Sequence, residues 1–116
     1  MVGQPRRPPA GAAAAGALAR SMIDVIATQR IKPGTEAEVE TLLRQTERDT
    51  LANDKGCLRY EWYRSQEPCA YVLIERWEDG ASVQAHFKAP HLAKALAALE
   101  PYAVEKFTVQ RLSRLD

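Results

Sequence analysis

The stretch Cys57–Trp77, CLRYEWYRSQEPCAYVLIERW, decides the fold because it holds two runs of strand-forming residues joined by a very short turn. Residues 57–65 and 69–77 are rich in Tyr, Trp, Val, Leu and Ile, the side chains that favour β-strands. The Gln-Glu-Pro segment between them leaves room only for a hairpin turn. The sequence therefore predicts an antiparallel β-hairpin in the middle of the chain.

Upstream of the hairpin, the sequence predicts one strand followed by one helix. Residues 22–31 alternate between apolar and polar side chains, as expected of a strand with one buried face. After a Lys32-Pro33-Gly34 turn, Thr35 and Glu38 have the spacing of a capping box, which predicts the start of a helix. Apolar residues then recur at helical spacing to about Ala52.

Downstream of the hairpin, the sequence predicts two helical segments and a last strand. Residues 81–88 and 91–99 have helical apolar spacing, and Pro90 separates them. Residues 104–112 alternate as a strand after a second proline. The order βαββαβ is the split βαβ arrangement of the ferredoxin-like α+β class, with a four-stranded antiparallel sheet. Right-handed crossovers place both helical regions on one face of that sheet.

The opposite face of the sheet needs a cover of its own. In the third strand, Tyr71 and Leu73 lie on one face. Val72 and Ile74 lie on the other, so both faces are apolar. An exposed apolar face of this kind is typical of an interaction surface. We therefore expect two chains to pair sheet to sheet as a homodimer.

Length and composition fit one globular domain. Of the 116 residues, we expect 22–116 to form it, and residues 1–21, rich in Ala, Pro and Gly, to form a disordered tail. The 16 basic and 15 acidic residues give a formal net charge of +1, which provides no basic excess for nucleic acid. Apolar runs in the folded part fall far short of the roughly 20 residues that cross a bilayer. The tail is too weakly apolar for a typical secretion signal.

The two cysteines indicate a reducing environment. Cys57 and Cys69 lie at opposite ends of the predicted hairpin, farther apart than a disulfide allows. Together with the absence of an evident membrane or secretion segment in the sequence, this predicts a cytoplasmic protein with no membrane or nucleic-acid partner.

His86 and His91 are the only histidines in the chain. With Pro90 between them, they lack the i, i+3 or i, i+4 spacing at which two helical side chains bind one metal ion. We therefore predict no metal site. A histidine can instead exchange protons with a substrate hydroxyl, although an ordinary helix position explains either residue equally well.

Glu75 and Trp77 share one face of the third strand, which places a carboxyl group beside a large aromatic ring. A tryptophan at such a position is more often part of the core than of a site. Glu75 could also pair with Arg59 or Arg64 on the neighbouring strand. The sequence contains no P-loop, dinucleotide fingerprint, nucleophile elbow or zinc-ligand spacing.

The segment Ile74–His91, IERWEDGASVQAHFKAPH, closely resembles the antibiotic biosynthesis monooxygenase family, and most of all its small quinol monooxygenases. The resemblance includes Gly56-Cys57, Tyr60 and the turn after the first strand, and it extends from Met22 to near the end of the chain. It implies a dimeric α+β barrel made from two ferredoxin-like chains. It also implies oxidation of a small quinol-like or polyphenolic ring by molecular oxygen, without metal, flavin or haem.

The resemblance also implies roles for individual side chains. His86 would exchange protons with the substrate, and Trp77 would form part of the cavity wall around the reacting ring. Four further residues are implied to bind the substrate: Gln29, Tyr60, Glu75 and His91. The expected partners are a second copy of the chain, a small aromatic substrate and oxygen, with no cofactor.

Three alternatives remain open at this point. Haem-degrading relatives use an asparagine, a tryptophan and a haem-ligating histidine. The matching positions in this chain are Gln29, Trp77 and approximately Leu96, so this chain shares only the tryptophan with them. A related isomerase acts on a phosphorylated hydroxy-diketone signal and shares the His and Pro-His pattern, but its phosphate needs a cationic side chain or a helix N-terminus in the pocket. A dimeric module that binds a small ligand without catalysis is the third.

Overall fold

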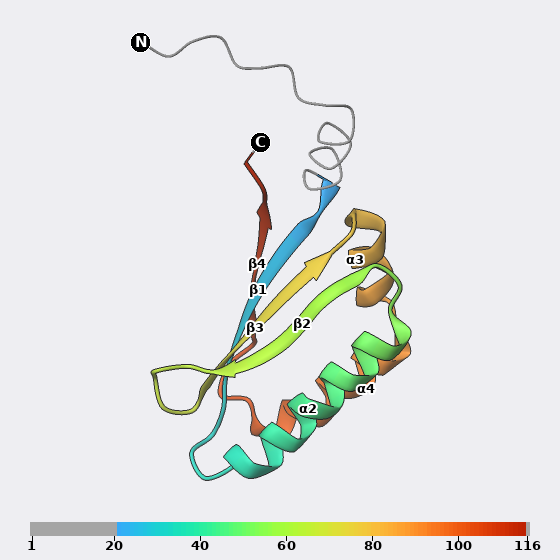
Figure 1. Ribbon diagram of the computed structural model, residues 1–116. Helices are drawn as coiled ribbons and strands as arrows, with labels where there is room; N and C mark the ends of the chain where they lie inside the picture. Colours follow the sequence, from blue (N-terminus) through green and yellow to red (C-terminus); the bar gives the residue numbers. More distant parts are fainter. Residues whose placement is uncertain (1–20, 116) are drawn as a thin grey trace, which may run out of the picture.

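The computed structural model describes residues 21–115 and contains the strands and helices in the predicted order (Figure 1). The strands are β1 (Ile23–Arg30), β2 (Cys57–Arg64), β3 (Ala70–Trp77) and β4 (Thr108–Ser113). The helices are α2 (Glu36–Asn53), α3 (Gly80–Phe87) and α4 (Pro90–Leu99), followed by the 3₁₀ turn η1 (Glu100–Tyr102). The tail predicted for residues 1–21 lies, except for its last residue, outside the described part of the chain.

The four strands form one antiparallel sheet in the order β2-β3-β1-β4. β2 and β3 make the predicted hairpin, and β3 then pairs with β1, where Val25 lies opposite Glu75. Cys57 pairs with Trp77 at the far end of the hairpin from Cys69, and both thiols are free. This topology confirms the ferredoxin-like α+β fold.

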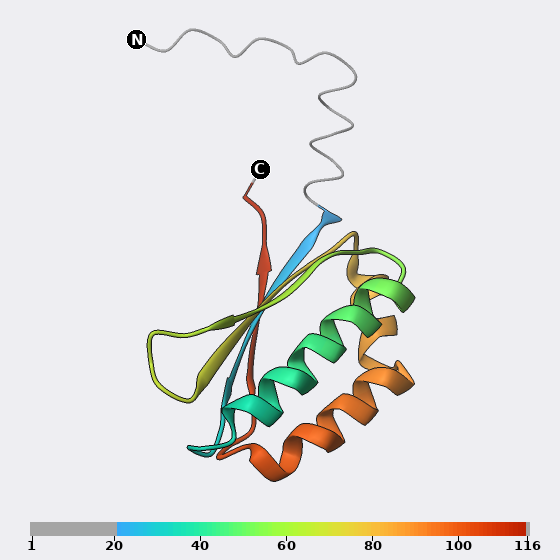
Figure 2. The same ribbon diagram turned by 60° about the horizontal axis from the view of Figure 1, so that its bottom comes forward.

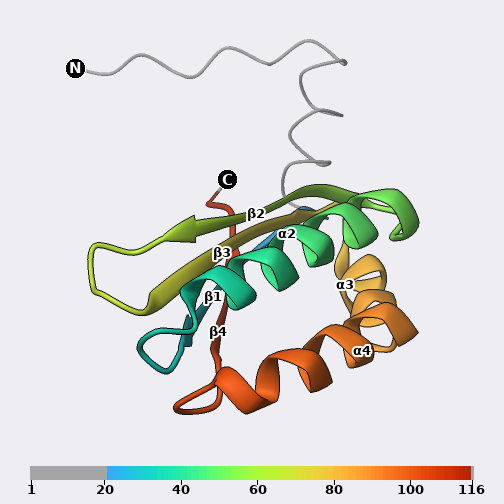
Figure 3. The ribbon, with the colours of Figure 1, turned by 90° about the horizontal axis from the view of Figure 1, so that it is seen from below.

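Helices α2, α3 and α4 all cover the same face of the sheet (Figures 2 and 3). Two buried clusters fill the space between the layers. The first contains Val25, Ala27, Tyr60, Leu73, Trp77 and Val83. The second contains Ile31, Val39, Leu43, Tyr71 and Leu99. Among the described residues, no helix is both long and apolar enough to span a membrane.

Two local predictions at element ends are wrong. Thr35 does not cap α2 with its side chain, because its backbone (φ −105°, ψ 9°) is not extended and its hydroxyl donates to the Lys32 carbonyl at 2.7 Å. β4 begins at Thr108 rather than at residue 104. The preceding segment instead bridges the end of β1, where the Val104 N–H donates to the Arg30 carbonyl at 3.1 Å.

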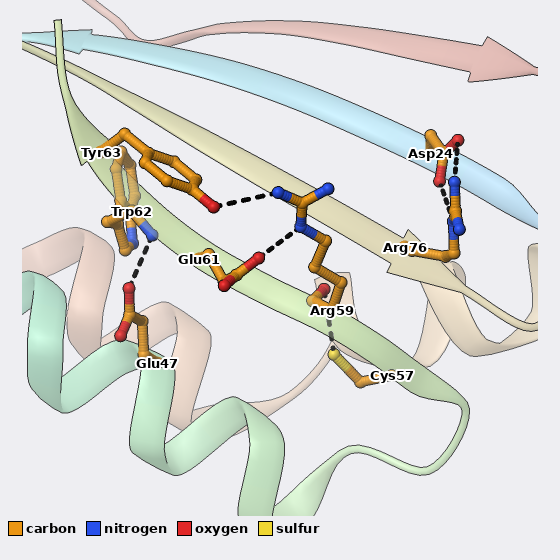
Figure 4. Close-up of polar contacts among 8 residues, drawn as sticks. All are labelled: Asp24, Glu47, Cys57, Arg59, Glu61, Trp62, Tyr63 and Arg76. Carbon is orange, nitrogen blue, oxygen red and sulfur yellow. Dashed lines mark hydrogen bonds and ion pairs between the residues drawn. The ribbon is translucent and has the colours of Figure 1, made fainter.

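The face of the sheet opposite the helices carries apolar and charged side chains together. Ile26 and Ile74 are cross-strand neighbours on β1 and β3, and both are half-buried. Charged groups on this face form ion pairs, as Figure 4 shows: Asp24 on β1 with Arg76 on β3 at 2.7 Å, and Arg59 with Glu61, both on β2. This face therefore presents apolar surface together with charges that are already paired.

Candidate functional site

A narrow pocket that is partly open to solvent lies between the sheet and the helices. Most of its wall is apolar and comes from Ala27, Trp62, Leu73, Phe87, Leu92, Ala95, Leu96, Leu99, Phe107 and Val109. The polar side chains in the wall are Gln29, Thr46, Tyr60, Glu75 and His86. An apolar pocket with a few converging polar groups is the usual form of a small-molecule site.

His86 lies in the last turn of α3, a helix that begins where the Asp79 carboxylate accepts a hydrogen bond from the Ser82 amide at 2.8 Å. The imidazole is only 2% exposed. Its ring packs against Trp77, with centroids 4.7 Å apart, and against the edge of Tyr60 at 5.4 Å. The aromatic contacts from β2 and β3 therefore hold the ring in one place.

Asp54, which directly follows α2, is the polar partner of His86. Its Oδ2 lies 2.5 Å from His86 Nδ1 and 3.1 Å from His91 Nε2. A carboxylate only accepts hydrogen bonds, so the ring nitrogens that face it carry the hydrogens. His86 Nε2 is then the ring nitrogen that can accept a proton.

His86 and His91 come close to each other although they lack the spacing of two ligands on one helix. Pro90 ends one helix and starts another, so His86 and His91 approach Asp54 from α3 and α4. Their ligand atoms and the Asp54 oxygen lie within 4.8 Å of one another, and within the described part of the chain this is the group of three that could hold a metal ion. The hydrogen bonds to Asp54 account for the arrangement without one.

Burial sets the protonation of His86. It lowers the pKa of the imidazole below its ordinary value of 6.5, while the nearby Asp54 carboxylate acts in the opposite direction and raises it. Burial has the larger effect. At neutral pH the ring is therefore in the uncharged form, which is the form that accepts a proton.

Glu75 points from β3 into the same pocket and is 5% exposed. Its Oε1 accepts a hydrogen bond from Trp77 Nε1 at 2.9 Å. Burial raises the pKa of the carboxyl to about 7, and the tryptophan hydrogen bond only partly opposes that effect. Near neutral pH, Glu75 can therefore either accept or release a proton.

The alternative pairing of Glu75 with a strand arginine does not form. Arg59 pairs with Glu61, and Arg64 pairs with Glu40 from α2. Arg59 does not pair with Glu75 because the register of β2 is irregular beside Cys57. The irregularity turns the arginine away from the helices to the opposite face of the sheet (Figure 4). Among the described residues Glu75 has no cationic partner, and burial therefore dominates its pKa.

The remaining predicted site residues divide between the pocket wall and the layer behind it. Tyr60 and Gln29 are part of the wall. Burial raises the pKa of Tyr60 well above its ordinary value, so the phenol keeps its proton. The Gln29 amide donates to the Arg30 and Glu105 carbonyls at 2.9 and 3.1 Å. Trp77, which is completely buried, and His91 are not part of the wall.

Asp54 is the functional residue that sequence reasoning did not identify. The segment Asn53-Asp54-Lys55-Gly56 carries the ordinary signals of a helix end, and no motif marks the aspartate. Its role depends on where the end of α2 lies relative to α3 and α4. Only the fold determines that placement.

A family model for the antibiotic biosynthesis monooxygenases matches residues 22–98, and the chain belongs to this family. Among solved structures, it is similar to a Caulobacter crescentus protein described as a candidate antibiotic biosynthesis monooxygenase, with 25% identity and a TM-score of 0.79 over 90% of this chain and 99% of the other. It is also similar to Rv0793 from Mycobacterium tuberculosis, with 26% identity and a TM-score of 0.75 over 83% and 97% of the two chains.

A conserved protein from Methanosarcina mazei shares the fold, with 21% identity and a TM-score of 0.79 over 86% of this chain and 99% of the other. A comparison with curated protein sequences gave no match. The family is therefore established by the sequence match to residues 22–98, and the solved structures agree with the fold.

Proposed function

We propose that the chain is a cofactor-independent monooxygenase that oxidises a small quinol-like or polyphenolic substrate with molecular oxygen. The observation that carries the proposal is the buried, uncharged His86, oriented by Asp54, in the wall of an apolar pocket. A phenolic ring bound there would meet a proton acceptor within a mostly apolar wall. Membership of the antibiotic biosynthesis monooxygenase family supports the same chemistry.

The reaction balances with oxygen as the sole oxidant. A hydroquinone and O₂ give a hydroxyquinone and water: one oxygen atom enters a ring C–H bond and the other leaves as water. The substrate supplies all the electrons. It is more easily oxidised as an anion, so the protein's contribution is to remove a hydroxyl proton and stabilise the resulting charge.

A quinol has two acidic hydroxyls, and the pocket contains two groups suited to accept their protons. His86 is uncharged at neutral pH, and the pKa of Glu75 is raised to about 7. Tyr60 keeps its phenolic proton because burial raises its pKa, so it can donate a hydrogen bond to the developing phenolate. We assign His86 the role of principal base and Trp77 that of the rigid support behind His86 and Glu75.

The composition of the pocket wall is less suited to the isomerase alternative. A phosphorylated substrate needs cationic side chains or free helix amides. Within the described residues, the wall contains neither Arg nor Lys. An uncharged aromatic substrate fits this wall better.

Oxygen consumption tests the proposal. With a panel of benzene and naphthalene quinols, we expect enzyme-dependent uptake of one O₂ per substrate and incorporation of one ¹⁸O atom from ¹⁸O₂. His86→Ala should lower kcat/KM by about 10²- to 10⁴-fold, the usual contribution of a general base. Lys94→Ala, at an exposed position on α4, is the matched control and should retain full activity.

Two results would contradict the proposal directly, and two others would identify an alternative function. The first is no enzyme-dependent oxygen uptake with any quinol, and the second is full activity in His86→Ala. If a quinol raises the melting temperature without turnover, the chain is a binding module. An oxygen-independent conversion of a phosphorylated hydroxy-diketone would instead identify the isomerase.

A further inference from the structure

Three ends of helices meet beside the pocket. Asp54 follows the last residue of α2, His86 lies in the last turn of α3, and His91 lies in the first turn of α4. Figure 3 shows these three segments side by side at one end of the helical layer. Side chains from α3 and α4 therefore converge on a single carboxylate oxygen at the end of α2.

The exposure of the three side chains increases from the pocket outwards. His86 is 2% exposed, Asp54 is 9% exposed and His91 is 19% exposed. His91 is absent from the pocket wall, and its polar contact in the described structure is with Asp54 Oδ2. Its position fits an interaction with the carboxylate better than contact with a substrate.

We propose that His91 is a positioning residue: its Nε2–H holds Asp54 Oδ2 against His86 Nδ1 and so keeps His86 in the tautomer whose Nε2 accepts protons in the pocket. The physical reason is that a carboxylate at the end of a helix can rotate. An Asp54 side chain that turned away would leave His86 Nδ1 without an acceptor, and the ring hydrogen could then move to Nε2. A second donor on the same oxygen opposes that rotation.

The effect on catalysis rests on the proposed function, whereas the effect on the His86 tautomer does not. The titratable groups around His86 come from every neighbouring element: Asp54, Tyr60 from β2, Glu75 from β3 and His91. Two of them act directly on its basicity, because Asp54 raises the pKa of His86 and charge on His91 lowers it. The loss of His91 therefore changes both the orientation and the charge environment of His86.

Two substitutions at position 91 distinguish the effect of the hydrogen bond from the effect of side-chain size. His91→Phe keeps a ring of similar size but has no donor, whereas His91→Gln can place an N–H close to where Nε2 lies. The readout is the His86 tautomer in the unliganded protein, measured by long-range ¹H–¹⁵N NMR at pH 8 with uniformly ¹⁵N-labelled protein. Asp54→Asn gives the reference for loss of the carboxylate, and Lys94→Ala on α4 is the control.

We expect the Nδ1–H tautomer of His86 to predominate in the wild type, His91→Gln and Lys94→Ala, and to give way to a mixture in His91→Phe and Asp54→Asn. If the proposed function holds, kcat/KM in His91→Phe should fall by about tenfold, a fraction of what a general base contributes. His91→Gln should restore most of that loss. All variants should unfold cooperatively, which circular dichroism checks.

An unchanged Nδ1–H tautomer in His91→Phe would overturn the inference. So would a folded His91→Gln variant whose His86 tautomer matches that of His91→Phe. Tight one-to-one Zn²⁺ binding by the wild type, lost in both position-91 variants, would also overturn it by making the cluster a metal site. A failure of all quinol assays would remove the proposed function but leave the tautomer result standing.

Discussion

Burial in the same pocket shifts the pKa values of His86 and Glu75 in opposite directions. Burial lowers the pKa of the histidine and raises that of the carboxyl, and in both residues it favours the uncharged form. Slightly below neutral pH, these two groups therefore leave the pocket wall uncharged. That condition suits an uncharged aromatic guest and leaves both groups able to take up or exchange protons.

Glu75 makes the free energy of unfolding depend on pH. Its pKa in the folded chain is about 7 against 4.5 for the ordinary residue, so between these values the folded state binds a proton that the unfolded state has released. Stability therefore falls as pH rises from 4.5 to 7. Relative to Glu75→Gln, we expect the wild type to lose up to about 3 kcal/mol over this range. Urea denaturation at a series of pH values measures the difference.

Lys94→Ala is the control for this experiment, because it changes an exposed residue without touching the pocket. Its stability profile should run parallel to that of the wild type. Parallel profiles for Glu75→Gln and the wild type would mean that the carboxyl titrates normally, and they would remove Glu75 as a proton acceptor near neutral pH.

At the scale of elements, the turn between α2 and β2 fixes Asp54 in place. Gly56 has a φ of 81°, and an added Cβ would lie 2.1 Å from Ser82 Oγ. Its carbonyl accepts a hydrogen bond from the Glu78 amide at 2.8 Å. The turn is thus packed directly against the start of α3, so a side chain at position 56 would disturb both elements that position the Asp54–His86 pair.

Gly34 provides a matched comparison for Gly56. Its φ is 86°, but nothing lies within 4 Å of an added Cβ. Gly34→Ala should therefore cost about 1 to 2 kcal/mol of stability through backbone strain alone. Gly56→Ala adds a steric clash and should cost about 3 kcal/mol or more. Urea denaturation compares the two, and equal losses would show that the contact with Ser82 relaxes without cost.

Most of the elements could be predicted from periodicity, because a buried sheet face and a buried helix face impose their repeats on the sequence. The same logic placed Glu75 and Trp77 on one face of the third strand. What could not be predicted depended on contacts between distant segments. Thr35 bonds to the preceding turn, and the segment before β4 bridges β1. Asp54 acquires its role only from the packing of three helix ends.

At the scale of the whole molecule, no described part of the chain covers the face of the sheet opposite the helices. Ile26 and Ile74 lie side by side there, with Val72 and Leu112 on the same face. The charged groups of this face, Asp24 with Arg76 and Arg59 with Glu61, already pair within the chain (Figure 4). A second copy could therefore cover this face without leaving a charge unpaired.

We expect the wild type to sediment as a dimer at micromolar concentration and Ile74→Lys to sediment as a monomer. The lysine would place an unpaired charge at the centre of the proposed interface, where burial without a partner costs several kcal/mol. Because Ile74 points away from the helices, the pocket on the other face should keep its shape, and a bound quinol should still raise the melting temperature.

Lys94→Ala, on the helix-covered side, should remain dimeric. A monomeric wild type, or a dimeric Ile74→Lys, would show that this face is not where two chains meet. Loss of quinol binding in a folded, monomeric Ile74→Lys would carry a different meaning. It would show that the second copy supports the pocket through the sheet, because the substituted side chain itself lies on the opposite face from His86 and Glu75.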